Sequence, residues 1–205
     1  MNNLDITPHK DIKIVYKDII KEEKCMFGLL KLWFVRLNVP YVSLESKNIG
    51  DKAVTKLSEK LIINRIVTDL NLGANKISDE GAQALSEVLK LNDTLSELVL
   101  RDNELGLEGA KALAEALKNN DTLTKLHLDK NKIGPEGVKL LAEALRENDT
   151  LTVLTLGQNK IGVEGAKALA EVLRENNTLT ELDLSSNKIG NEGVKELAEV
   201  LKINK

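Results

Sequence analysis

The sequence is poor in several residue types, and each shortage makes a class of site unlikely to occur. Among 205 residues there is one cysteine, Cys25, so no disulfide can form within the chain, which is typical of a reducing compartment. The two histidines, His9 and His127, are far apart in the sequence, and we predict no metal site. We also expect no cofactor. The glycine-rich residues 133–137, for example, lack the lysine and hydroxyl of a phosphate-binding loop.

Neither sign of charge dominates, and no long apolar run is present. The chain has 29 basic and 32 acidic residues, so we expect it to bind neither nucleic acid nor an anionic membrane. Residues 1–11 are polar and mildly acidic, unlike a secretory signal. The most apolar stretch, residues 25–35, is about half the ~20 residues that span a bilayer. These features predict a cytoplasmic protein; delivery into a host cell is an alternative that no secretion signal supports.

The most regular feature of the sequence is an asparagine that recurs every 28 residues. Its five copies are Asn75, Asn103, Asn131, Asn159 and Asn187. Self-similarity at a period of roughly 20 to 50 residues predicts stacked units, none of which can bury its apolar face alone. An inward carboxamide can bond both N–H and C=O groups of the backbone. We therefore expect these five side chains to form a structural ladder along the stack.

Each unit combines the periodicity of a strand with that of a helix, as residues 98–125 illustrate. Leu98 and Leu100 alternate with outward-facing residues, which predicts a half-buried strand. Residues 108–118 then carry one apolar stripe at helical spacing. Gly109 would let the helix backbone approach the sheet closely, and residues 120–121 would end the helix. On the outer helix face, i,i+4 pairs such as Lys139 with Glu143 predict a solvated surface of ion pairs.

The pattern Leu-x-x-Leu-x-Leu-x-x-Asn-x-Ile/Leu-Gly, followed by a helix, resembles the ribonuclease-inhibitor-like class of leucine-rich repeats. It covers residues 70–205 in five near-identical units, and a degenerate unit with Lys47 at the asparagine position precedes them. The repeat regions of NOD-like receptors are similar too. The resemblance implies an α/β leucine-rich repeat solenoid over residues 42–205, a right-handed horseshoe arc with a parallel sheet on its concave face and helices on its convex face.

Residues 1–41 differ in kind from the repeats, because they hold all five aromatic residues of the chain. These are Tyr16, Phe27, Trp33, Phe34 and Tyr41. Solenoids need terminal units that cover the open end of the core, so we interpret this segment as an N-terminal cap. A decayed repeat and an amphipathic helix that begins near Thr7 both remain open for it. At the other end the last unit keeps Val194 and Leu197, which leaves open a homodimer formed through that end.

Variation between units is concentrated at the strand positions that face the concave surface. A constant scaffold with different displayed groups is what a recognition surface requires, although drift at exposed sites gives the same pattern. The predicted partner-binding residues are Tyr41, Glu97, Val99, Arg101, Lys125, His127, Asp129, Thr155, Glu181 and Asp183. His127, Asp129 and Thr155 resemble a catalytic triad only superficially, because an open sheet neither excludes water nor supplies oxyanion donors.

We therefore predict no catalytic residues and a protein–protein interaction module whose partner is a protein of unknown identity. The resemblance points the same way, because the family members it suggests work through protein contacts. Two alternatives stay open. One is a regulator of a small GTPase, similar to the GTPase-activating protein of Ran. The other is a purely structural, near-consensus repeat array.

Overall fold

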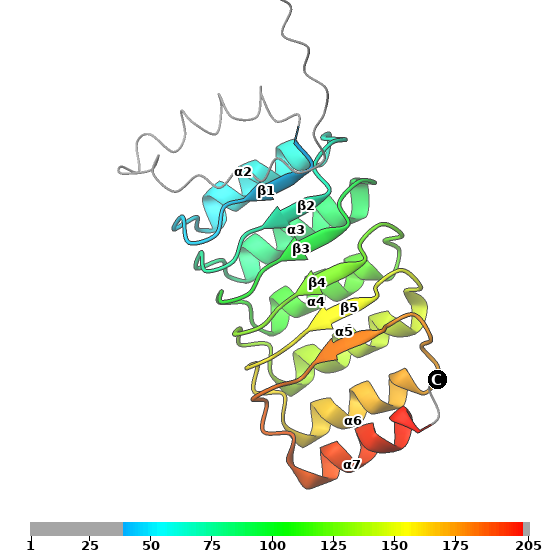
Figure 1. The fold of residues 1–205 in the computed structure, drawn as a ribbon. Coiled ribbons are helices and arrows are strands. Elements are labelled where there is room, and N and C mark those ends of the chain that lie inside the picture. Colours follow the sequence, from blue (N-terminus) through cyan, green and yellow to red (C-terminus); the bar gives the residue numbers. More distant parts are fainter. Residues whose placement is uncertain (1–38, 203–205) are drawn as a thin grey trace, which may run out of the picture.

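The computed structural model describes residues 39–202, which form a stack of strand–helix units (Figure 1). Within this range there are six strands and six helices. The strands are β1 Tyr41–Ser43, β2 Asp69–Asn71, β3 Glu97–Val99, β4 Lys125–His127, β5 Val153–Thr155 and β6 Glu181–Asp183. The helices are α2 Asp51–Leu61, α3 Asp79–Leu91, α4 Leu107–Leu117, α5 Gly134–Glu147, α6 Gly162–Leu173 and α7 Gly190–Leu201. The predicted N-terminal cap, decayed repeat or helix lies almost entirely outside the described residues.

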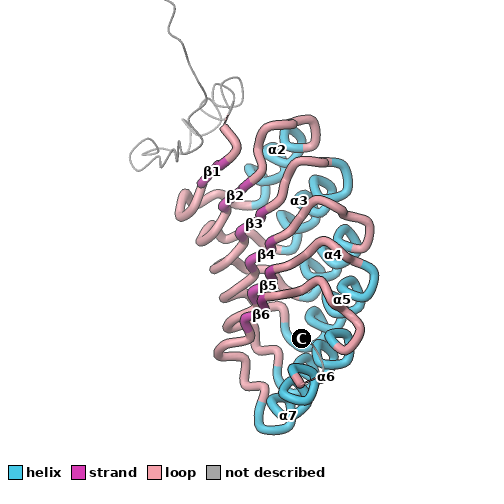
Figure 2. Tube along the Cα trace, turned by 45° about the vertical axis from the view of Figure 1, so that its right-hand side comes forward, coloured by secondary structure: helices cyan, strands magenta, loops and turns pink. Residues whose placement is uncertain are grey.

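All six strands pair in parallel and in chain order, from β1 to β6. The sheet lines one side of the solenoid and the helices line the other (Figure 2). Paired strands lie about 4.8 Å apart, whereas packed helices need about 8 to 10 Å. Each unit contributes one strand and one helix, so the strand side of the stack is shorter than the helix side. The sheet must therefore occupy the inner side of the arc. This confirms the predicted α/β leucine-rich repeat solenoid with its sheet concave.

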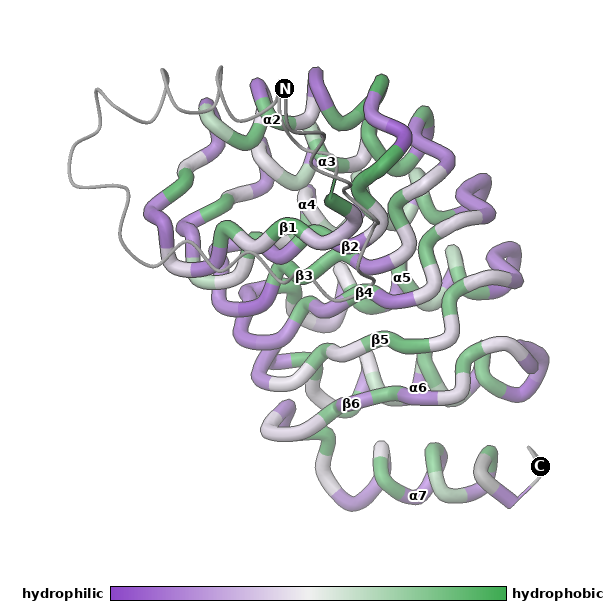
Figure 3. The backbone as a smooth tube through the Cα atoms, turned by 45° about the horizontal axis from the view of Figure 1, so that its top comes forward, coloured by the Kyte–Doolittle hydropathy of each residue, from purple (hydrophilic) through white to green (hydrophobic). Residues whose placement is uncertain are grey.

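The core lies between the sheet and the helices, where one apolar column from the strands meets the inward faces of the helices. Leu98, Leu126 and Leu154 at the strand centres are fully buried, as are Leu113 and Leu169 on the helices. In Figure 3 hydrophobic and hydrophilic stretches alternate along the tube, and many of the hydrophilic ones lie in the loops and on the outer turns of the helices. The period-2 and period-3.6 patterns of the sequence therefore both point into one shared core.

The asparagine ladder is present as predicted. The carboxamide nitrogen of Asn103 donates to the carbonyls of Leu72 in the preceding unit, at 3.1 Å, and Leu100 in its own unit, at 2.9 Å. Its oxygen accepts from the backbone N–H groups of Asn75 and Ile77, at 3.0 and 2.9 Å. Asn75, Asn131, Asn159 and Asn187 repeat this arrangement, and all five side chains are buried. Each carboxamide thus bonds a turn of its own unit to the unit before it.

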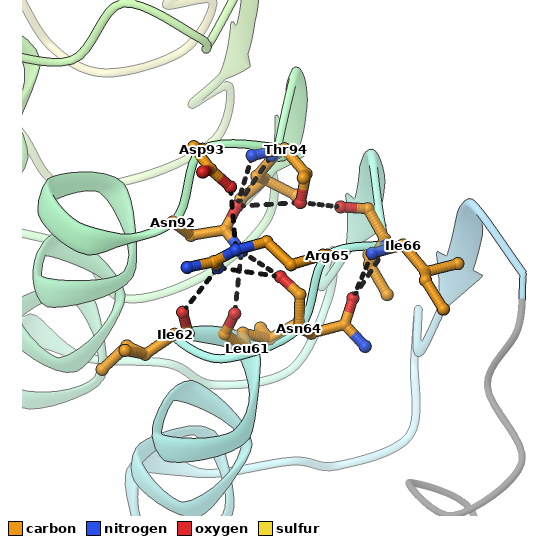
Figure 4. Close-up of polar contacts among 10 residues, drawn as sticks. Leu61, Ile62, Asn64, Arg65, Ile66, Asn92, Asp93 and Thr94 are labelled. Atoms are coloured by element: carbon orange, nitrogen blue, oxygen red, sulfur yellow. Dashed lines mark hydrogen bonds and ion pairs between the residues drawn. The ribbon is translucent and has the colours of Figure 1, made fainter.

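A second asparagine ladder runs along the other edge of the solenoid, where the helices lead into the strands. Asn92 donates to the carbonyls of Leu61 and Asn64 in the preceding unit, at 2.8 and 2.7 Å, and accepts from the N–H groups of Thr94 and Leu95 (Figure 4). The equivalent residues Asn120, Asn148 and Asn176 make the same bond to the preceding unit. The sequence predicted only that such asparagines end helices; the structure adds a role between units.

The glycine near the start of helices α3 to α7 was predicted to let the helix approach the sheet, and at two of these positions the structure shows a different close approach. A Cβ on Gly137 would lie 3.0 Å from the Cβ of Ala110, and one on Gly193 would lie 2.9 Å from the Cβ of Ala166. Both alanines belong to the preceding helix, so the close approach that glycine permits is between neighbouring helices rather than between helix and sheet. Replacing either hydrogen with a methyl group would push the helices apart.

The last helix of the described solenoid exposes an apolar side chain that the following helix buries in the other units. In the last helix, Val194 points toward the side where another unit would stack and is 52% exposed. Val54, at the equivalent position of the first helix, is fully buried because α3 covers it. The end at α7 is therefore apolar and uncovered by the described residues. The homodimer that the sequence suggests through this end stays a prediction.

The ladder predicts a large loss of stability for Asn131→Ala. The change leaves the buried N–H of Leu105 without its acceptor and removes one of the two carboxamide donors at the carbonyls of Leu100 and Leu128. An unsatisfied buried polar group costs about 1 to 3 kcal/mol. Chemical denaturation of Asn131→Ala beside Asn119→Ala measures this, because Asn119 is exposed. Equal stability of the two variants would contradict the ladder's contribution.

Candidate protein-binding face

The concave face displays two columns of strand residues that point away from the core. Paired positions run from Tyr41 through Asp69, Glu97, Lys125 and Val153 to Glu181, and from Ser43 through Asn71, Val99, His127 and Thr155 to Asp183. A third column, just past the strands, contains Glu45, Gly73, Arg101, Asp129, Gly157 and Ser185. This is the predicted register, so the concave face brings all the predicted partner-binding residues onto one surface.

Both basic side chains of the concave face are held by carboxylates. The Arg101 guanidinium lies 3.1 Å from Glu45, two units away, and the Lys125 ammonium lies 3.2 Å from Glu97 on the neighbouring strand. These side chains are about half exposed, at 58% and 48%, so water screens the pairs and each contributes little to stability. Arg101 and Lys125 are thus each paired locally with a carboxylate.

The three residues of the superficial triad do lie together in the structure, but their hydrogen bonds do not activate the Thr155 hydroxyl. They are His127, Asp129 and Thr155. Thr155 donates its only hydroxyl proton to the Asp129 carboxylate in a short hydrogen bond. His127 Nδ1 lies 3.2 Å from the same hydroxyl, which leaves the ring as the donor in that contact. Asp129 also accepts from the Gly157 N–H at 2.9 Å. A general base would have to accept the hydroxyl proton, so this chain of contacts orders the face rather than preparing a nucleophile.

These side chains surround a shallow hollow of about 350 Å³ near the middle of the concave face. It is lined by Glu45, Asn71, Glu97, Val99, Arg101, His127 and Asp129. Five of the predicted residues therefore line one depression. Lys125 and Thr155 contact its lining, through Glu97 and through His127 and Asp129. Tyr41, on β1, and Glu181 and Asp183, on β6, lie on the end strands of the sheet and outside the hollow.

Carboxylates outnumber cations over the whole face. Glu45, Asp69, Glu97, Asp129, Glu181 and Asp183 face only Arg101 and Lys125. Both cations lie in the half of the sheet that ends at β4, so the acidic excess is greatest around β5 and β6. Asp183 there accepts from the Ser185 N–H at 2.7 Å. The face is therefore polar and mostly acidic.

A row of lysines on the loops that follow the strands was missed by the sequence reasoning. Its members are Lys76, Lys130, Lys132, Lys160 and Lys188, all exposed. Backbone bonds such as Lys130 N–H to the Gly157 carbonyl at 2.7 Å extend the strand pairing into these loops, so the row keeps strand-like spacing. Lys132 pairs with Glu104 at 3.0 Å. The sequence does contain a pattern that predicts this row, because a lysine directly follows the ladder asparagine in four of the five units.

The helix face carries ion pairs with a different spacing from the one predicted. Lys139 contacts Glu136 at 2.9 Å rather than Glu143, and Lys167 contacts Glu192 of the next helix at 2.7 Å rather than Glu171. The i,i+4 pairing was wrong because a flexible lysine can reach back one turn or across to the next helix. The hydrogen bond between Lys167 and Glu192 raises the pKa of Lys167 and lowers the pKa of Glu192.

Two other cations of the helix face, Arg146 and Lys118, also have raised pKa values. The hydrogen bond to Glu171 raises the pKa of Arg146, which also contacts Glu175 at 3.4 Å. The hydrogen bond to Glu115 raises the pKa of Lys118. Among residues 39–202 no group of three or more potential metal ligands occurs, and no helix has the length and apolar character to cross a membrane.

Sequence and structure comparisons agree with this architecture. A leucine-rich repeat family model matches residues 64–86, 91–114, 119–142, 147–170 and 175–198, so the chain belongs to the leucine-rich repeat family. No curated protein is similar enough to match. The ribonuclease-inhibitor-like subclass stays a prediction from the 28-residue period.

Solved structures show the same fold. Actin-Binding Site 2 of leiomodin-1 is 27% identical, with a TM-score of 0.65 over 73% of this chain and 87% of that one. The C-terminal domain of Caenorhabditis elegans tropomodulin is 17% identical, with a TM-score of 0.63 over 74% of this chain and 92% of that one. This second likeness concerns the fold alone.

The contacts of Asp129 predict that its side chain orders the concave face. Asp129→Ala removes the acceptor of the Thr155 hydroxyl and of the Gly157 N–H, so we expect a loss of roughly 1 to 3 kcal/mol in the free energy of unfolding. Asp121→Ala, at an exposed loop position, should change it by less than about 0.5 kcal/mol. Urea titrations of both variants make the comparison, and an Asp129→Ala variant as stable as the control would refute the assignment.

Proposed function

We propose that this protein is a non-enzymatic interaction module that binds a protein partner through its concave face and the adjoining loop lysines. The binding residues are those predicted from the sequence on β1 and β3 to β6, together with Lys76, Lys130, Lys160 and Lys188. The acidic sheet and the basic loop edge lie side by side. A partner that matches both would be held in one orientation, since charge complementarity fixes register more than it raises affinity.

The observation that carries this proposal is the contrast between constant and variable columns of the same sheet. The strand centres are leucine from β2 to β6, and Val42 stands there in β1, whereas the columns on either side change in nearly every unit. Packing explains why the central column is constant. Recognition of an irregular protein surface is a physical reason for the variable columns to differ from one strand to the next.

The absence of catalysis is part of the proposal and is supported by the contacts of Thr155. Its hydroxyl proton points to Asp129, and His127 is placed to donate to the hydroxyl oxygen. The hollow beside these groups is open to water, which weakens any electrostatic stabilisation of a transition state. The alternatives of a GTPase regulator and of a purely structural array have no supporting observation of their own in the described residues.

The likeness to Actin-Binding Site 2 of leiomodin-1 makes actin the first partner to test. We propose actin on this ground alone. The concave face and the fold are compatible with another protein, so the assay should separate the choice of partner from the choice of surface.

A co-sedimentation assay with actin tests surface and partner together. The concave variant Arg101→Glu, Lys125→Glu breaks the two ion pairs of that face. The control Lys118→Glu, Lys139→Glu breaks two ion pairs of the helix face, with Glu115 and Glu136, and changes the net charge equally. We expect actin to retain the wild type and the control but to lose most of the concave variant.

Two outcomes would contradict the proposal. Equal retention of both variants would place the binding surface outside the concave face. If actin retains none of the proteins, the same three proteins serve as baits for cell extracts. The proposal then requires a protein that binds the wild type and the control but not the concave variant, and finding none would overturn it.

A further inference from the structure

Three exposed apolar residues lie at or shortly after the ends of the first two described helices. Ile63 is 73% exposed, Leu91 57% and Ile66 39%. Ile63 and Leu91 are one repeat apart and occupy the same position on adjacent units. Later units place Asn119, Glu147 and Glu175 at that position, and Thr94, Thr122, Thr150 and Thr178 at the position of Ile66. Ile203 of the last unit also falls at this position in the sequence but lies outside the described residues. Among the described residues the apolar character is thus confined to the first two units. We call Ile63, Ile66 and Leu91 the apolar edge.

The apolar edge rests on a well-connected frame. Arg65 contacts Asp93 at 3.1 Å and donates to the Ile62 carbonyl at 2.9 Å (Figure 4). Asn92 bonds the two loops together through the carbonyls of Leu61 and Asn64. Hydrogen bonds therefore fix the loop backbone that carries Ile63 and Ile66, while the apolar side chains themselves are exposed. Single exposed apolar residues are ordinary, whereas three at the same end of adjacent units offer apolar surface to an occupant.

The chain enters the solenoid beside this edge. The Pro40 carbonyl accepts from the N–H groups of Thr68 and Asp69, at 2.8 and 3.0 Å, so residue 40 lies next to the loop that contains Ile66. In Figure 4 the side chain of Ile66 lies on the side of that loop that faces β1. The 38 residues that precede the described solenoid are thus tethered at the border of the apolar edge.

The composition of that preceding segment matches the surface. Residues 27–34 contain Phe27, Trp33 and Phe34 as well as three leucines, whereas no aromatic residue follows Tyr41. Residue 34 is five residues from Val39, which packs against the core, so an extended connection reaches up to about 18 Å. Such a short tether gives the segment a high effective concentration at the edge.

We propose that residues 27–34 of this chain dock on the apolar edge formed by Ile63, Ile66 and Leu91. Docking would bury aromatic surface of the segment and apolar surface of the solenoid together, which is favourable for both. It would also explain why, among the described residues, only the first two units carry apolar side chains at these positions. The inference concerns a surface away from the concave face and stands whether or not the proposed partner binding is correct.

Trp33 provides a direct test, because it is the only tryptophan in the chain. The edge variant Ile63→Asn, Leu91→Glu, Ile66→Thr carries residues that later units have at the same positions, so the fold should tolerate them. The control Leu107→Asp, Val194→Ala treats two other exposed apolar residues in the same way. We expect the edge variant to shift the Trp33 emission to the red and to raise its quenching by acrylamide, and the control to leave both unchanged.

The remaining outcomes overturn the proposal. A water-exposed Trp33 in the wild type would show that the segment does not dock. Equal protection of Trp33 in the wild type and the edge variant would place the segment elsewhere. Protection that depends on protein concentration, with a dimer in light scattering, would make a second copy the occupant. Far-UV circular dichroism verifies the fold of each variant, and the single changes Ile63→Asn and Leu91→Glu repeat the test if the triple variant does not fold.

Discussion

The carboxamides of the ladder asparagines hold neighbouring units together at the turns where the sheet ends. Each strand is only three residues long, and the backbone bonds that continue the pairing into the loops do not reach the inward-facing groups that the carboxamides bond, such as the N–H of Ile77. Asn103 and its equivalents satisfy donors and acceptors of two adjacent units at once. Without them, buried N–H groups at these turns would lack partners.

The second ladder has the same effect on the opposite edge of the solenoid. Asn92, Asn120, Asn148 and Asn176 bond the end of each helix to the preceding unit. With both edges fixed, the strand residues between them lie in straight columns across the sheet. The concave face can then vary from unit to unit at little cost, because its side chains contribute little to the core. The two asparagine ladders therefore account both for the constant core and for the freedom of the concave residues to vary.

Much of this architecture could be predicted from the sequence because the period is constant. A repeat of 28 residues fixes which residues are neighbours, so the columns from Tyr41 to Glu181 and the ladder from Asn75 to Asn187 followed directly. A period does not say which neighbour a small residue touches, and Gly137 proved to face the preceding helix. The period also does not determine side-chain conformations. Arg101 reaches Glu45 across two units and Lys167 reaches the next helix, and both contacts depend on long flexible side chains.

The ladder's role as the element that fixes the stack can be measured most directly by NMR. Hydrogen exchange of the side-chain carboxamide protons of Asn75, Asn103, Asn131 and Asn159 would be compared with that of exposed Asn119. If the ladder holds the stack, the buried protons exchange only when the solenoid unfolds as a whole, whereas those of Asn119 exchange at the rate of a free amide. Ladder protons that exchange as fast as those of Asn119 under native conditions would contradict the account.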